Sequence, residues 1–320
     1  MKITRNLDRD GTFGPLALNY LAGIPQQHLF FREQQLRHPA SIYNLSLEKL
    51  GGAFAAVTEE YARDTARFSV EPNGGFDLKS LLDAQEHLIR CAQEHLADCY
   101  LILKTFVNPA TTKATAIHAD EYINDFKLPG IKSFVQAIAD YKSSLRIADR
   151  LKHNQGRLRG IGIFPGDGAY LGYYLEEPNR DGVLSPSPEI HPNQGAFSFA
   201  RDLKWRFFLV YSLSENLVKA VERALAGLHQ VSLERAAPPR QQNEAWNRLT
   251  ETMSEIERAI FPKEMDTSVA TVLLTNDGRQ LSIKFPDRIR IVYPALQGRV
   301  RAVVSTMGDG FSTQFKMPIP

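Results

Sequence analysis

The sequence predicts a mainly α-helical protein of the α+β class: a four-helix bundle with an inserted β-hairpin and a small C-terminal antiparallel β-unit. Three observations lead to this prediction. Apolar residues recur at three- and four-residue steps in four long segments, as they do in helices with one buried side. A glycine-rich turn separates two apolar runs near residues 160–176, which is typical of a hairpin. After residue 268, short runs with turn signals between them replace the helical period.

The first forty residues contain glycines and prolines that interrupt any long helix, and a short helix is expected only at 26–36. We interpret residues 1–40 as an N-terminal arm packed on the main body. The first long helix is expected at 43–68. Asp77 can cap the second, expected at 78–107, where apolar residues recur with a seven-residue period.

A polar loop with a short helix near Asp120 is expected at 111–130. The third long helix is expected to begin at Ile131 and to continue to the polar stretch that ends at Arg159. The hairpin follows, with its turn at 165–168. The fourth long helix is expected at 198–228, after a loop rich in proline, asparagine, serine and glycine.

The C-terminal part begins with a linker at 236–240 and one more amphipathic helix at 243–260. Five short strands are expected after it, at 268–274, 279–285, 288–293, 299–305 and 311–317. Asn276-Asp277-Gly278 is a typical hairpin turn between the first two. A β-unit of about 50 residues is too small to be stable alone. It is therefore expected to pack on the bundle or to add strands to the 160–176 hairpin. The predicted domains are 1–40, 41–235 and 236–320.

Composition limits the possible functions of this 320-residue chain. A net charge of +2 gives no strong overall field, so any binding of nucleic acid has to use local patches. Cys91 and Cys99 lie eight residues apart on one predicted helix, about 12 Å, which is too far for a disulfide. Free thiols indicate a reducing compartment, so a cytoplasmic location is expected. No apolar run is long enough for a signal peptide or a membrane span, so no membrane association is expected.

The best candidates for chemistry lie at the end of the third helix. Arg146 and His153 are off its buried stripe, and a spacing of seven residues is close to two turns, so they share one flank. Helical side chains lean toward the N-terminus, so His153 leans toward Arg146. Asp149 can orient the imidazole from one turn away. The positive patch around the pair, which suits a phosphate, includes Arg150, Lys152, Arg157 and Arg159.

The Arg146-x6-His153 spacing resembles the Arg-x4–6-His motif of the HEPN superfamily, and Leu151–Asn154 (LKHN) is similar to a sequence in some of its branches. The family usually has a polar residue directly after the arginine, where this chain has Ile147. The resemblance covers roughly residues 41–229. It implies a helical bundle, often a homodimer, and a metal-independent endoribonuclease of bacterial defence or toxin systems. It also implies that Arg146 and His153 are catalytic and that no metal or other cofactor is needed.

In this interpretation His153 exchanges a proton while the RNA 2′-hydroxyl attacks the neighbouring phosphate, and Arg146 stabilises the negative charge that develops there. Arg150, Lys152, Asn154 and Arg157 bind the RNA backbone. One alternative is binding of RNA or phosphate without cleavage. Another is a non-catalytic helical interaction module, in which a structural His153 and its basic neighbours stabilise the helix C-terminus.

Other features have simpler interpretations. His87, Cys91, His95 and Cys99 form a column on the second helix that could hold a metal only with ligands from His118, His191 or His229. We interpret this column as core and flanking residues, and predict no metal site. The glycines between 160 and 168 form a hairpin turn, because no strand–GxGxxG–helix order surrounds them.

The sequence alone does not decide the role of two further sets of residues. Glu189, Ile190 and His191 lie in the loop before the fourth helix and could edge a pocket beside His153. Trp205 and Phe208 lie off the main stripe of the fourth helix. They belong either to the core or to a dimer surface.

Overall fold

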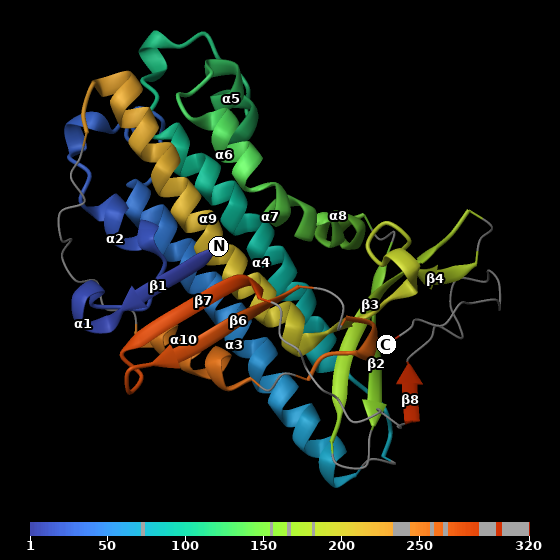
Figure 1. Ribbon diagram of the computed structural model, residues 1–320. Coiled ribbons are helices and arrows are strands. Elements are labelled where there is room, and N and C mark those ends of the chain that lie inside the picture. The colour runs from blue at the N-terminus through green and yellow to red at the C-terminus, as the bar shows by residue number, and fades with distance from the viewer. Residues whose placement is uncertain are drawn as a thin grey trace.

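Helices and two antiparallel sheets form a mixed α+β protein, as the sequence predicts. The computed structural model describes residues 1–71, 74–153, 156–164, 168–180, 183–232, 244–256, 259–264, 268–287, 299–302 and 320. Figure 1 shows three long helices side by side, with one sheet packed across them and the other beside one of their ends. These helices are α3 (Pro39–Val70), α4 (Lys79–Lys104) and α9 (Phe199–Ala224).

The predicted apolar stripes of α3 and α4 are buried against each other and against α9. α3 begins four residues before its predicted start. The His38 Nδ1 accepts a hydrogen bond from the Ala40 N–H at 3.2 Å, and Pro39 is well tolerated in the first turn. Asp77 has the predicted role, because its Oδ1 accepts a hydrogen bond from the Lys79 N–H at 2.9 Å.

The fourth predicted helix is α9, followed by one π-helical turn, η4 (Leu225–His229). Trp205 and Phe208 are covered from within the molecule. Their ring centroids lie 4.4 and 5.2 Å from that of Phe285. Core packing is therefore confirmed for Phe208, which is buried, whereas Trp205 is half-buried and packs against the edge of the core.

The prediction of one continuous third helix is wrong. The segment forms α6 (Ile131–Ala137), α7 (Ala139–Ser144) and α8 (Arg146–Lys152). The backbone leaves the helical region at Ile138 (φ −99°, ψ 13°), and α7 ends at Leu145 (φ −90°, ψ −4°), whose N–H donates to the Lys142 carbonyl three residues back. The reason is a change of packing partner, because α6 and α7 contact α9 whereas α8 contacts α4. The two bends let the segment cross from one helix to the other while its apolar residues stay buried.

The first sheet pairs the N-terminal strand with two strands from the C-terminal part of the chain. β1 (Lys2–Asn6) pairs antiparallel with β7 (Gln280–Asp287), which pairs with β6 (Val269–Thr275). β1 lies in the segment that was interpreted as an arm, and the sequence analysis did not predict it. The hairpin turn between β6 and β7 is confirmed, with positive φ at Asn276, Asp277 and Gly278. β6 packs against α9 and α10 (Glu244–Glu255).

The second sheet contains the predicted hairpin, formed by β2 (Arg157–Phe164) and β3 (Tyr170–Pro178). Its strand order is β4-β3-β2-β8, and a further short strand pairs with β3. The remaining strands are β4 (Leu184–Pro186), β5 (Phe197–Ser198) and β8 (Arg299–Ala302). Both arrangements that were predicted for the C-terminal strands occur. β6 and β7 pack on the helices, and β8 pairs with β2 of the hairpin. The linker at 236–240, Pro165–Asp167 of the turn, and the strands expected at 288–293 and 311–317 lie outside the described residues.

The shorter elements fill the periphery. The helix expected near Asp120 is confirmed as α5, whereas residues 26–36 form only one 3₁₀ turn, η1. The bounds are α1 (Leu7–Asp10), α2 (Leu16–Ala22), η1 (Gln26–His28), η2 (Pro109–Thr111), α5 (Ala119–Phe126), η3 (Pro192–Gln194) and η5 (Pro262–Glu264). Across the described ranges, no helix combines the length and the apolar character that crossing a bilayer requires.

A set of buried polar side chains ties the helices to the second sheet. Asp202 on α9 accepts hydrogen bonds from Arg206 Nε at 2.7 Å and from Gln85 Nε2 at 2.8 Å. Gln85 also donates to the Tyr173 hydroxyl of β3 at 3.2 Å. All four side chains are less than one tenth exposed. Because buried polar groups need partners, this set specifies how α4, α9 and β3 meet.

Candidate functional site

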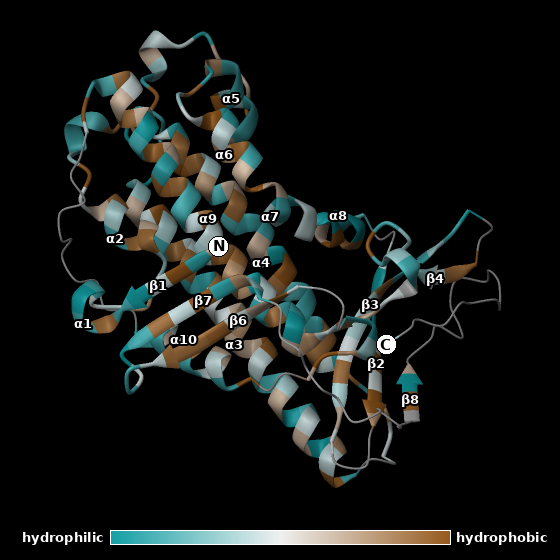
Figure 2. Ribbon diagram, in the orientation of Figure 1, coloured by the Kyte–Doolittle hydropathy of each residue, from teal (hydrophilic) through white to brown (hydrophobic). Residues whose placement is uncertain are grey.

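α8 lies where the helical part meets the second sheet, close to the loop between β4 and β5 (Figure 1). Ile147, Ala148 and Leu151 are buried on one side of α8, and the opposite side is polar. Figure 2 shows this division as alternating brown and teal along α8. The helix is therefore amphipathic, and its outer side carries the residues that the sequence analysis singled out.

Arg146 and Arg150 lie one turn apart on α8 and share one carboxylate. Arg146 Nη1 lies 3.2 Å from Glu189 Oε1, and Arg150 Nη2 donates to Glu189 Oε2. The side chains of Arg146 and Glu189 are 58% and 40% exposed. The hydrogen bond from Arg150 and the charges of both arginines lower the pKa of the Glu189 carboxyl. Two guanidinium groups thus converge on one anionic group at the protein surface.

His153 is the C-cap residue of α8, and its side chain is exposed. Its backbone N–H donates to the Asp149 carbonyl at 3.3 Å. The expected contact between the Asp149 carboxylate and the imidazole is wrong. Asp149 Oδ1 instead accepts a hydrogen bond from Gln93 Nε2 of α4 at 2.8 Å. Asp149 therefore fixes α8 to α4 and does not orient His153.

The structure keeps Arg146 and His153 on one short helix, one at each end. A rise of 1.5 Å per residue puts them about 10 Å apart along its axis. Lys152 is exposed beside His153, and Arg157 is exposed at the start of β2. Asn154 lies outside the described residues. The guanidinium of Arg146 is directed to Glu189, so no direct contact joins the two predicted catalytic side chains within the described structure.

The loop that carries Glu189 is held by a buried histidine. His191 Nε2 accepts a hydrogen bond from the Leu175 N–H at 2.8 Å, so Nδ1 carries the proton and donates to the Gly195 carbonyl at 2.8 Å. Burial lowers the pKa of His191 to about 4. This neutral ring anchors the loop to β3. Glu189 therefore contacts Arg146 and Arg150, whereas His191 supports the loop; a pocket beside His153 stays a prediction.

Three members of the histidine and cysteine column on α4 are buried, including Cys91, and His87 is exposed. His95 and Cys99 are buried, and His95 Nδ1 forms a 2.9 Å hydrogen bond with the Ser46 hydroxyl. Burial lowers the pKa of His95 to about 4. Cys91 Sγ lies 3.6 Å from His87 Nε2, and both cysteines are free thiols. Among the residues with described positions, no three His, Cys, Asp or Glu side chains are grouped so that they could hold a metal ion.

Sequence reasoning missed one residue of this site, Gln93, and the partners of another, Glu189. Gln93 was not considered, because a glutamine on the flank of a helix has no distinctive signal. The contact of Glu189 with both arginines was missed because 39 and 43 residues separate it from them. The i, i+4 spacing of Arg146 and Arg150 was the signal that could have indicated a shared anionic partner.

The arrangement can bind an anion at the two guanidinium groups and can exchange a proton at the exposed imidazole. Comparisons of the chain with models of protein families, with curated protein sequences and with solved structures found no match. The HEPN resemblance thus depends on the residues around α8 alone.

Proposed function

We propose that this chain is a HEPN-like RNA-binding protein that cleaves RNA without a metal, with Arg146 and His153 as its catalytic pair. One observation carries the proposal. Both side chains are exposed on the outer side of one helix, and Arg150, Lys152 and Arg157 are close to them in the chain. An arginine that can hold a phosphate and a histidine that can move a proton are the two groups that cleavage by the RNA itself requires.

In the proposed reaction His153 removes the proton of a ribose 2′-hydroxyl, and the 2′-oxygen attacks the adjacent phosphorus. The bond from phosphorus to the 2′-oxygen forms, and the bond from phosphorus to the 5′-oxygen of the next nucleotide breaks. The products are a 2′,3′-cyclic phosphate and a 5′-hydroxyl, whose oxygen takes up a proton from water, and the proton that His153 accepted returns to the solvent. Arg146 stabilises the additional negative charge on the phosphoryl oxygens. Arg150, Lys152, Asn154 and Arg157 bind neighbouring phosphates.

The position of Glu189 supports a phosphate site at Arg146 and Arg150. Its two carboxylate oxygens are each met by a different guanidinium group, and two oxygens of a phosphate can be met in the same way. The contact is exposed to water, where ion pairs are weak because solvent screens them. An incoming phosphate can therefore displace Glu189.

The resemblance also leads us to propose a homodimer and a HEPN-type bundle. α3, α4 and α9 would correspond to three helices of such a bundle, and the bent segment α6–α8 to the fourth. A second subunit could bring its own basic surface to the same RNA. Light scattering of the purified protein tests this part separately.

Incubation of labelled RNA with the full chain in EDTA tests the catalytic assignment. We expect Arg146→Ala and His153→Ala each to slow cleavage by about 100-fold or more, which is the usual effect of removing a positioned acid–base or charge-stabilising group. His118→Ala and Arg90→Ala are matched controls, because both residues are exposed and lie outside α8. Equal cleavage by all four variants, or no cleavage at any protein concentration, contradicts the proposal.

Replacement of Glu189 tests the phosphate site without removing a cation. We expect Glu189→Gln to tighten RNA binding and to steepen its dependence on salt, because the two arginines lose a competing anion. Glu94→Gln is the control, since Glu94 is an exposed carboxylate paired with Lys49 at 3.6 Å. Binding that is unchanged by Glu189→Gln argues against a phosphate site at this position.

The second candidate is a non-catalytic helical interaction module. The contact between Gln93 and Asp149 favours it, because Asp149 is then held away from the role of orienting His153. His153 would act only at the C-terminus of α8. This candidate predicts that His153→Ala lowers the thermal stability slightly and that the wild-type protein leaves RNA intact.

A further inference from the structure

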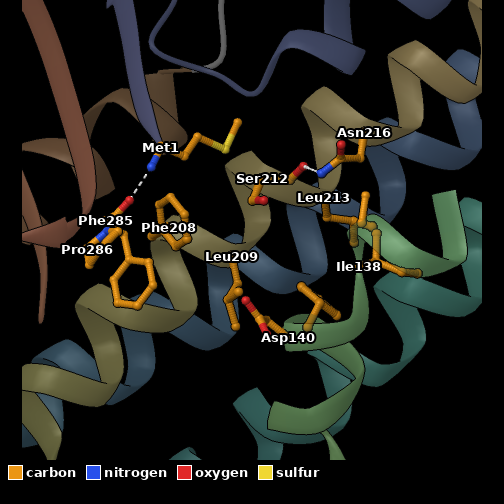
Figure 3. Close-up of a pocket in the computed structure, with 12 residues that line it drawn as sticks. Met1, Ile138, Asp140, Phe208, Leu209, Ser212, Leu213, Asn216, Phe285 and Pro286 are labelled. Atoms are coloured by element: carbon orange, nitrogen blue, oxygen red, sulfur yellow. Dashed lines mark hydrogen bonds between the residues drawn. The ribbon is translucent and has the colours of Figure 1, made fainter. Parts of the chain in front are cut away.

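A cavity of about 280 Å³ lies where β7, α9 and the bent segment α6–α7 meet (Figure 3). Its lining contains the Met1 ammonium group, which donates to the Phe285 carbonyl, and the exposed carboxylate of Asp140. Because a positive and a negative group line the same cavity, its composition does not select the charge of a ligand. A more specific pair of side chains lies at the end of α9 that is remote from α8 (Figure 1).

This pair consists of two histidines from distant parts of the chain. His28 ends η1, and His229 ends η4, the π-helical turn after α9. Their ring centroids lie 5.1 Å apart, with an angle of 58° between the ring planes. Two imidazoles that bind the same tetrahedral ion through bonds of about 2.0–2.1 Å have ring centres roughly 5 Å apart. The separation of the two rings therefore matches that of two histidine ligands of one metal ion.

His229 has the hydrogen bonding that is typical of a metal ligand. Its Nε2 is covered from solvent and has no hydrogen-bond partner in the part of the chain that the structure describes. The ring also hydrogen-bonds to the Phe106 backbone, and because this contact raises the pKa of His229, the acceptor is the carbonyl oxygen. Nδ1 therefore carries the proton, and the lone pair of Nε2 is free. Metal-binding histidines usually donate their second N–H to a backbone carbonyl in this way.

The surroundings of the pair favour a neutral, well-placed ring. Burial and the neighbouring His28 lower the pKa of His229, so its ring is neutral at pH 7, which is the form that binds metals. The Phe30 ring stacks on His229 with a centroid distance of 6.0 Å. The Gln27 side-chain nitrogen lies 3.4 Å from His28 Nε2, a long contact that an ion can replace. His28 is only half-buried, so a rotation of its side chain can admit an ion to His229 Nε2.

We infer that His28 and His229 together bind one divalent transition-metal ion of the class that prefers imidazole, such as Zn²⁺. Among the residues with described positions no third His, Cys, Asp or Glu joins the pair, so water completes the coordination. Mg²⁺ prefers oxygen ligands and is not expected to bind. A bound ion joins η1 to the end of α9 and thereby stabilises the folded state.

The pair also has a simpler interpretation, which is packing among the rings of His28, Phe30 and His229. In that case replacement of either histidine lowers the melting temperature of the metal-free protein, and Zn²⁺ has no effect that depends on these residues. The metal site predicts instead that Zn²⁺ raises the melting temperature of the wild-type protein and not that of His28→Ala. The two interpretations are thus separable.

Isothermal titration calorimetry of the full chain, freed of metals with EDTA and then dialysed, tests the inference with Zn²⁺ and with Mg²⁺ as the comparison. We expect Zn²⁺ to bind, and His28→Ala and His229→Ala each to weaken its binding about tenfold or more, because each removes a protein ligand. His118→Ala is the control for an exposed histidine elsewhere. His87→Ala is the second control, because His87 and Cys91 form another pair of possible ligands, 3.6 Å apart.

Several results overturn the inference. The first is the absence of Zn²⁺ binding, or binding of Mg²⁺ as tight as that of Zn²⁺. The second is an affinity for Zn²⁺ that neither His28→Ala nor His229→Ala lowers, or that His118→Ala or His87→Ala lowers equally. Circular dichroism verifies the fold of each variant, and His28→Ala decides the question if His229→Ala does not fold. The proposed RNA cleavage is tested in EDTA and uses neither histidine, so failure of one proposal does not affect the other.

Discussion

At Gly172 in β3 the structure leaves no room for a Cβ atom. A Cβ atom there would lie 2.3 Å from the Phe197 carbonyl oxygen and 2.3 Å from Cε2 of Phe261. The backbone oxygen belongs to the neighbouring strand β5, so it cannot move without loss of the pairing. We expect Gly172→Ala to lower the free energy of unfolding by about 3 kcal/mol or more. Urea denaturation followed by circular dichroism measures this.

Gly52 in α3 provides the control at the same scale. A Cβ atom at Gly52 meets nothing within 4 Å, and the residue lies inside a helix. Gly52→Ala should therefore raise the free energy of unfolding by about 1 kcal/mol, because alanine has the higher helix propensity. A similar effect of both substitutions would mean that the close approach at Gly172 does not determine its tolerance.

At the scale of elements, the contact between α4, α9 and β3 depends on a buried ion pair. Arg206 and Asp202 are less than one tenth exposed, and Gln85 adds a hydrogen bond to the same carboxylate oxygen. We expect Asp202→Leu alone to destabilise the protein by about 3–5 kcal/mol, because it leaves a buried guanidinium without its counter-charge. Asp202→Leu combined with Arg206→Met should recover most of this loss, since no charge is then buried. Denaturant unfolding of the single and double variants measures both effects.

The exposed pair of Lys79 and Asp83 on α4 is the matched comparison. Its two side chains are 79% and 66% exposed and lie 3.0 Å apart. Asp83→Leu should change the free energy of unfolding by less than about 0.5 kcal/mol, because water screens the pair. If the double variant at positions 202 and 206 is as unstable as Asp202→Leu, then packing, and not the unpaired charge, explains the loss.

At the scale of the whole molecule, two buried histidines make stability depend on pH. Burial lowers the pKa of both His95 and His191 from 6.5 to about 4. As the pH falls below 6.5, the unfolded chain binds protons that the folded chain does not yet bind. Stability is therefore lost between pH 6.5 and pH 4, at roughly 1.4 kcal/mol per pH unit for each histidine. Urea midpoints measured across this range give the slope.

Single variants separate the two histidines from the carboxylates, which also titrate at the acid end of this range. His95→Asn and His191→Gln each remove one titrating ring, so each should reduce the slope by the contribution of one proton. His118→Gln replaces an exposed histidine and should leave the slope unchanged. A slope that none of the three variants alters would assign the acid sensitivity to other groups.

Much of the architecture could be predicted because local patterns determine it. The stripes of α3, α4 and α9, the cap at Asp77 and the turn at Asn276–Gly278 depend on residues close together in the chain. The candidate site was predictable only to the extent that Arg146, Arg150 and His153 lie on an exposed side of one helix. Glu189 and Gln93 were not predictable as partners, because no local spacing connects them with α8.

The sequence by itself determined the α+β class, the long helices and the two hairpins. These features follow from the spacing of apolar residues along a helix or strand and from the backbone preferences of turn residues, and both depend on residues that are close in the chain. Only the tertiary structure decided that the third helix bends twice, that β1 completes a sheet with β6 and β7, and that Glu189 lies between two arginines. The physical reason is that these features depend on contacts between distant segments, and such contacts form only where packing brings their surfaces together.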